Sequence, residues 1–216
     1  ETYPFSPALI DIVLKKIPAR GGFQNVRGEL AFLGNLVKLT YQENDIITAA
    51  DASLQDKANL IMLRDLDTGG DFIDRAKENM EELSSKTPLS TKFASSVLLH
   101  TITGFSADKG ASRSDLVCDL LSPDSDINAF NHAVISFQKY ASYFHTEGDR
   151  FYFDIEEQPE AKVEYRSLDY ADDRARESII ELFKVEIFRE TTSAVVFSNV
   201  DPTKQMLNQF DKSRPR

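Results

Sequence analysis

Residues 143–153 read "YFHTEGDRFYF", with aromatic side chains alternating with polar ones on both sides of a short polar centre that contains Gly148. Alternation of this kind around a glycine-containing turn predicts a β-hairpin. We expect the alternate aromatic residues Tyr143, Phe151 and Phe153 to be divided between the core and the exterior. The hairpin is unusual because the patterns before it are helical.

Three helical patterns precede the hairpin, at 90–106, 112–122 and 126–141, and residues 107–111 between the first two are expected to be a linker. Ser112 and Asp115 have the spacing of a capping box, in which aspartate replaces the usual glutamate. Asp126 can cap the third helix, whose apolar positions predict one buried stripe: Ile127, Phe130, Val134, Phe137 and Ala141. Three helices followed at once by a hairpin is the order of a winged helix-turn-helix. We therefore expect a winged-helix domain at 89–155, with the hairpin as its wing.

The residues before this domain predict a helical subdomain at 1–88. Ser6-Pro7 can start a helix that ends before Pro18. A second helix is expected at 24–40, and its apolar spacing places the following residues on one face: Val26, Leu30, Leu33, Val37 and Tyr41. Residues 156–216 predict a linker and a partial α/β segment, with a helix at 172–188 and a buried strand at 193–202. The fold class is therefore mainly α with some β, that is, α+β.

Composition bounds the class of protein and its partners. The chain has 216 residues, a formal net charge of −10 and one cysteine, Cys118. No apolar run approaches the roughly 18 residues that a membrane span needs, so no membrane partner is expected. One cysteine excludes an internal disulfide and fits a reducing, cytoplasmic compartment. A chain that starts at Glu1 without a signal peptide suggests a piece of a longer protein.

Motifs for catalysis and metal binding are absent from the sequence where spacing can test for them. The glycines at 104 and 110 do not have the G-x-x-x-x-G-K-[ST] order of a phosphate-binding loop, and no G-x-S-x-G elbow occurs. The three histidines lack the spacing and companions of a metal site. We predict no catalytic or metal-ligating residue. His100 is expected to be a hydrogen-bonded core residue, Cys118 a buried inert thiol, and the acids at 154–157 a solvated linker.

Charge argues against DNA as the partner of the winged helix, although the fold suggests it. Between residues 93 and 154, four lysine and arginine residues stand against eight carboxylates. A DNA reader needs cations on the recognition helix and the wing. Lys139, His145 and Arg150 are the candidate contacts if DNA is bound. Packing against another protein domain is the interpretation that the charges favour.

Two segments resemble a known family. "YPFSPALIDIVLKKI" (3–17) with "GFQNVRGELAFLGNLV" (22–37), and residues 110–154 from "GASRSDLVCDLL" to the hairpin, are similar to the large bacterial ATPases catalogued as domain of unknown function 499. In that family the first segment follows the ATPase core and resembles the lid of AAA-type ATPases, and a winged helix comes after it. Ser6 stands where the family usually has histidine, so the chain departs from the pattern there.

The resemblance implies that this chain is a non-catalytic regulatory or interaction fragment of a larger P-loop ATPase. Arg27 would be the sensor-2-like arginine that reaches the nucleotide phosphates; the simpler interpretation is a surface arginine paired with Glu29. ATP and Mg²⁺ would bind in the parent protein and not in this chain, and the ATPase core of the same polypeptide would be its partner. The family is often encoded in phage-defence or restriction-like gene clusters. The alternative is a stand-alone winged-helix module that binds DNA or adapts proteins.

Overall fold

The computed structural model describes residues 2–19, 21, 26–41, 45–67, 69, 71–105, 108–123, 125–168 and 172–182. The chain forms two compact units, Glu1–Tyr165 and Arg166–Arg216. Helix α10 (Asp172–Leu182) lies in the second unit. The strand expected at 193–202, and the part of the expected helix beyond Leu182, lie outside the described residues.

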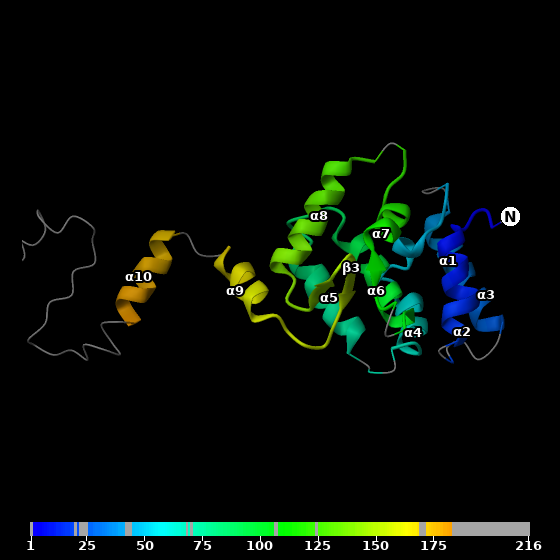
Figure 1. Cartoon of the computed structure of the whole chain (residues 1–216), viewed down its shortest axis with the longest axis horizontal. Coiled ribbons are helices and arrows are strands. Elements are labelled where there is room, and N and C mark those ends of the chain that lie inside the picture. Colours follow the sequence, from blue (N-terminus) through cyan, green and yellow to red (C-terminus); the bar gives the residue numbers. More distant parts are fainter. Residues whose placement is uncertain are drawn as a thin grey trace, which may run out of the picture. The chain divides into compact units, whose positions relative to one another are not determined.

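The first unit is mainly helical with a small antiparallel sheet, as expected for an α+β fold (Figure 1). Its helices up to α9 follow in the order α1 (Pro7–Asp11), η1 (Ile12–Lys16, a π-helix), α2 (Ile17–Ala19), α3 (Val26–Thr40), η2 (Ala49–Asp51, a 3-10 helix), α4 (Lys57–Arg64), α5 (Phe72–Leu83), α6 (Ser90–Thr103), α7 (Arg113–Leu120), α8 (Ile127–Tyr140) and α9 (Pro159–Ser167). The strands are β1 (Ala111–Ser112), β2 (Phe144–Glu147) and β3 (Arg150–Phe153). Among the described residues, no helix is long and apolar enough to cross a membrane.

Helix caps form where the sequence places them. The Ser6 side chain accepts a hydrogen bond from the amide of Leu9 at the start of α1. Ser112 and Asp115 form the expected capping box at α7, and Asp126 caps α8. The first helical run continues to Ala19 instead of ending before Pro18, and its middle is a π-helix.

Helix α6 occupies the centre of the first unit and is buried from Phe93 to Thr103. It packs against α5, η2, α7 and β3. Leu83 of α5 and Phe93 of α6 belong to one hydrophobic core. The boundaries expected after residues 88 and 155 both fall inside the first unit, and the hydrophobic core continues across the first of them.

The hairpin is confirmed, and its aromatic residues line the core. Strands β2 and β3 pair antiparallel, with Phe144 opposite Phe153 and Glu147 opposite Arg150. The expected division between core and exterior is wrong, because Tyr143, Phe151 and Phe153 are all buried. The rings of Phe151 and Phe153 extend a cluster around Phe93 and Phe137 on the helices. Phe144 connects them, because its ring contacts those of Phe137, Phe151 and Phe153.

A third strand joins the hairpin, and the sequence did not indicate it. β1 pairs antiparallel with β3, which gives the strand order β1-β3-β2. Gly110 precedes β1 with a φ of 84°, and a Cβ atom at that position would lie 2.3 Å from the carbonyl oxygen of Phe151. Only glycine therefore allows the segment, which resembled a linker, to approach the hairpin this closely.

The residues expected to share one face of α3 lie along one side of the helix, but this side is not the one that is fully buried. Phe32 and Leu36 are buried, whereas Val26, Leu30 and Tyr41 are exposed. The helix carries two apolar stripes, so spacing alone could not choose between them. Asn35 orients the helix, because its side-chain amide donates to Asp56 and Asn59 at the start of α4.

Candidate functional site

The sequence-predicted cations do not form one site. Arg27 lies in the first turn of α3 on the exposed surface. Lys139, near the end of α8, forms an ion pair with Glu164 at 3.4 Å. His145 lies on β2 and Arg150 on β3. Helix α3 lies far from the hairpin within the first unit (Figure 1), so Arg27 and the other three residues cannot serve one ligand together.

Arg150 and His145, the two hairpin residues that were candidates for contact with DNA, both form contacts within the chain. Arg150 donates to the carbonyl oxygen of Gly110 at 3.0 Å and lies 3.3 Å from the Asp108 carboxylate. These contacts fasten the loop before β1 to β3. His145 accepts a hydrogen bond from the Gln158 amide at Nδ1, and its Nε2 donates to the carbonyl of Glu156 at 2.8 Å.

A second lysine beside the sheet is also held internally. Nζ of Lys109 lies 2.7 Å from Oδ2 of Asp154 and 4.7 Å from the centre of the Tyr152 ring. Burial raises the pKa of Asp154, but the hydrogen bonds from Lys109 and from the amide of Ile155 outweigh it and hold the pKa below its usual value. The expected solvated linker is wrong for Asp154, because this carboxylate ties the end of β3 to the loop before β1.

The outward face of α8 is nearly free of charge. Its sequence, "INAFNHAVISFQKY", contains no carboxylate and one lysine. The exposed side chains on the helix are Ile127, Asn128, His132, Ile135, Gln138 and Lys139. Ile127 was expected in the core, but it lies one turn before Phe130 at the open end of the stripe. Two exposed isoleucines among amide side chains suit contact with protein better than contact with phosphates.

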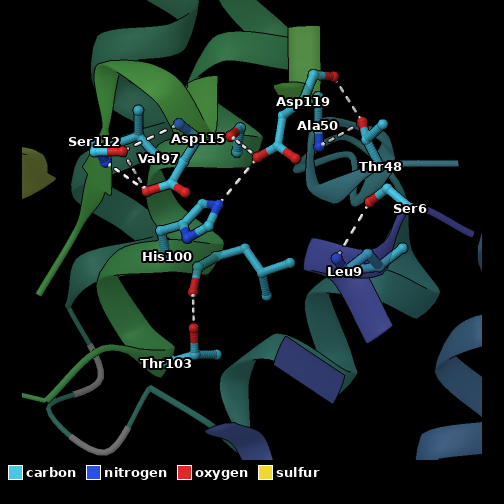
Figure 2. A network of polar contacts seen from close by, with 12 residues as sticks. Ser6, Leu9, Thr48, Ala50, Val97, His100, Thr103, Ser112, Asp115 and Asp119 are labelled. Atoms are coloured by element: carbon cyan, nitrogen blue, oxygen red, sulfur yellow. Dashed lines mark hydrogen bonds and ion pairs between the residues drawn. The ribbon is translucent and has the colours of Figure 1, made fainter. Parts of the chain in front are cut away.

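The strongest cluster of polar residues is buried and is centred on Asp119 (Figure 2). Ser96 Oγ donates to Oδ2 of Asp119 at 2.7 Å, and Nε2 of His100 lies 3.0 Å from the same oxygen. The side chains of His100 and Asp119 are only 3% and 1% exposed. Thr48 Oγ1 donates to the backbone carbonyl of Asp119 at 2.7 Å. The cluster therefore joins the loop before η2, helix α6 and helix α7.

Local sequence explains how these groups are positioned. Ser96 and His100 are four residues apart, so they lie on one face of α6. Asp119 occupies the last turn of α7, three residues after buried Leu116. Thr48 is held by a capping box with Asp51, in which Asp51 accepts from the Thr48 amide at 2.9 Å. His100 is thus the hydrogen-bonded core histidine that the sequence predicts.

The geometry of this cluster does not suit nucleophilic catalysis. A serine nucleophile needs histidine as its direct hydrogen-bond partner, with the acid behind the histidine. Here Ser96 and His100 both form a hydrogen bond with Oδ2 of Asp119, so they are linked through the acid and not directly to each other. Burial also keeps substrate away from Ser96. The arrangement connects segments of the fold, and we assign it a structural role.

Asp119 is the residue that reading the sequence missed. It falls on the same side of α7 as Leu116 and is buried, while Cys118 between them is exposed. The expectation of a buried Cys118 is therefore wrong: Leu116 is buried, whereas Val117 and Cys118 are both exposed. The signal that could have found Asp119 is an acid at a core position of a helix, three residues after a leucine.

Comparison of the chain with protein-family models, with curated proteins and with solved structures gave no match. Among the residues that the structure describes, no group of three or more histidine, cysteine, aspartate or glutamate side chains could hold a metal ion.

Proposed function

We propose that this chain is a protein-binding module of a larger bacterial AAA-type ATPase, and that residues 90–153 act in it as a winged helix that contacts protein and not DNA. The chain itself performs no catalysis in this proposal. ATP and Mg²⁺ bind in the ATPase core of the parent protein. A phage-defence or restriction-like system is the setting that the family resemblance suggests.

The order of elements supports the winged-helix part of the proposal. Helix α6, strand β1, helices α7 and α8 and strands β2 and β3 follow in that order, with β1 beside β3 in the sheet. Three helices with a three-stranded sheet in this strand order are typical of winged helices. In such a domain α8 takes the position of the recognition helix.

Charge supports protein over DNA as the partner. Arg150 and Lys109 both contact carboxylates of the same chain, and the turn of the hairpin carries Glu147 and Asp149. Binding to DNA requires cations that neutralise phosphates, and it is disfavoured by a chain of net charge −10. The nearly uncharged outward face of α8 is the observation that carries the proposal.

A titration with duplex DNA tests the choice of partner. The full chain is added to a fluorescein-labelled duplex at low and at physiological salt, and anisotropy is recorded. We expect no binding tighter than about 10⁻⁴ M, the weak end of nonspecific affinities. Micromolar binding that weakens with salt and with Lys139→Ala and Arg150→Ala would instead establish the alternative, a stand-alone DNA-binding winged helix.

The link to an ATPase rests on the sequence resemblance and on Arg27. An exposed guanidinium on α3 can reach the nucleotide of an adjoining core domain and stabilise charge on the γ-phosphate. In the parent protein, Arg27→Ala is expected to lower kcat for ATP hydrolysis by about a thousandfold, the lower end of the range for arginines that stabilise the γ-phosphate. Arg64→Ala, which removes an exposed cation of α4, is the matched control. Equal activity of the two variants would contradict the role of Arg27.

A further inference from the structure

Helix α3 exposes an apolar face that the described residues of the first unit do not cover. The side chains of Val26, Leu30 and Tyr41 are 65%, 64% and 73% exposed. Val26, Leu30, Gly34 and Tyr41 follow one another at intervals of four, four and seven residues. These intervals place all four along one side of the helix. Exposed apolar side chains that lie next to one another mark a contact surface, whereas single exposed apolar residues are common on any protein.

The middle of this face allows close approach. Leu33 and Val37 are partly buried against the core and widen the face on its inner side. At Gly34 an added Cβ atom would meet no heavy atom within 4 Å. A glycine between larger apolar residues leaves a low point in the surface, and side chains at the contact set how closely two helices pack. The shape therefore suits a helix laid along α3.

The edge of the face is positively charged. Arg27 and Lys38 are both exposed. They are eleven residues apart, which is about three helical turns, so they lie on the same edge of the helix. The exposed residues of α3 include no carboxylate, because Glu29 is partly buried. This is notable in a chain of net charge −10. Two cations beside an apolar stripe select a partner that carries acids in the matching place.

We propose that this face of α3 binds an amphipathic α-helix of a partner protein, whose apolar stripe is bordered by carboxylates. A second copy of the chain fits less well. Antiparallel pairing of two α3 helices would bring both cationic edges to the same side, where Arg27 and Lys38 of the two copies repel each other. The surface lies before the proposed winged helix in the chain, so the inference is independent of the choice between protein and DNA. Arg27 is assigned to the nucleotide in the proposed function, so Lys38 is the cation on which the inference and its test depend.

Two synthetic helical peptides test the proposal with the full chain. They share one leucine stripe, which is bordered by glutamate in the first peptide and by lysine in the second. We expect the glutamate peptide to bind at least about tenfold more tightly in an anisotropy titration, since like charges across an interface are disfavoured. Leu30→Glu should weaken its binding at least about tenfold, and Lys38→Glu should reduce or reverse the preference between the peptides. Ile155→Glu, at an exposed position after β3, should change neither affinity.

Each contrary result has a definite meaning. Equal affinity for the two peptides, no binding of either, or full affinity in the Leu30→Glu variant overturns the proposal. A sedimentation experiment that shows dimers dissociated by Leu30→Glu assigns the face to a second copy instead. Binding to phosphatidylserine vesicles that is lost in Leu30→Glu assigns it to a lipid surface. Circular dichroism confirms that the variants are folded, and the result with duplex DNA is independent of all these outcomes.

Discussion

Nε2 of His100 lies 3.0 Å from Oδ2 of Asp119, and this contact joins α6 to α7 inside the core. The same oxygen accepts the hydroxyl of Ser96, so one carboxylate oxygen contacts two side chains of α6. The other nitrogen of the ring, Nδ1, and the other carboxylate oxygen, Oδ1, are buried without a hydrogen-bond partner among the described residues. Each member of this buried contact therefore keeps one polar atom that no other described residue satisfies.

Removal of the Asp119 carboxylate should destabilise the fold strongly. Asp119→Ala leaves the Ser96 hydroxyl and the His100 imidazole buried without their acceptor. Breaking a buried pair by removing one member costs about 3 kcal/mol or more. Denaturant unfolding of the full chain measures the loss, and Asp11→Ala, whose carboxylate is exposed in a pair with Lys15, is the control at about 0.5 kcal/mol or less. A loss at Asp119 as small as the control would show that the cluster contributes little.

The hydroxyl of Thr48 attaches the loop before η2 to the same cluster. Thr48→Val keeps the shape of the side chain but removes the donor to the Asp119 carbonyl and the acceptor for the Ala50 amide. We expect a loss of about 1–2 kcal/mol in the free energy of unfolding, the cost of a missing cap and a buried hydrogen bond. Ser53→Ala, which removes a hydroxyl bonded to an exposed amide, should cost less. Equal losses would mean that the bond to Asp119 adds nothing.

Two glycines with positive φ should respond differently to alanine. Gly110 has a φ of 84° and Gly148 a φ of 61°, so both substitutions cost about 1–2 kcal/mol in backbone strain. At Gly110 the new Cβ atom would also lie 2.3 Å from the Phe151 carbonyl oxygen, whereas at Gly148 it would meet nothing within 4 Å. Gly110→Ala should therefore cost at least about 2 kcal/mol more, because β1 must leave β3. Thermal or denaturant unfolding compares the two, and equal costs would argue that the pairing of β1 is dispensable.

Local signals in the sequence were sufficient for the caps and for the hairpin. Ser112 with Asp115, and the alternation around Gly148, depend on contacts between residues close in the chain. The orientation of α3 was not predictable in this way, since it depends on Asn35 meeting Asp56 and Asn59. Periodicity identifies a stripe, but only a distant contact decides which of two stripes is buried.

The Asp119 cluster and β1 show the same limit. Asp119 gains its role from Ser96, His100 and Thr48, which lie far from it in sequence. β1 has only two residues, too few for an alternating pattern, and Gly110 was interpreted as part of a linker. The sign of the hairpin's charge was apparent from the sequence. That Arg150 pairs with Asp108, and Lys109 with Asp154, was not apparent, because both pairs are formed across the folded unit.

The capping box of α7 should make stability depend on pH in the acid range. Burial raises the pKa of Asp115, but hydrogen bonds from the hydroxyl and amide of Ser112 outweigh it, so the pKa lies below the usual 3.8. A carboxyl with a lowered pKa in the folded state stabilises the fold at pH values above the unfolded pKa, and this contribution is lost as pH falls through the folded pKa. Asp115→Asn should therefore be less stable than the parent chain at neutral pH, by about 1 kcal/mol.

Glu82 provides a contrast of opposite sign that makes the pH experiment decisive. Burial raises the pKa of Glu82, and the hydrogen bond from Asn79 only partly offsets this. Its ionised form is thus disfavoured in the folded chain, and the penalty is present at neutral pH and relieved as pH falls through the raised pKa. Denaturant unfolding between pH 7 and about pH 3 should show the deficit of Asp115→Asn shrinking in acid. Glu82→Gln should instead be more stable than the parent chain at neutral pH, and this difference in the free energy of unfolding should decrease over the same range. Parallel profiles for the two variants and the parent chain would contradict both assignments.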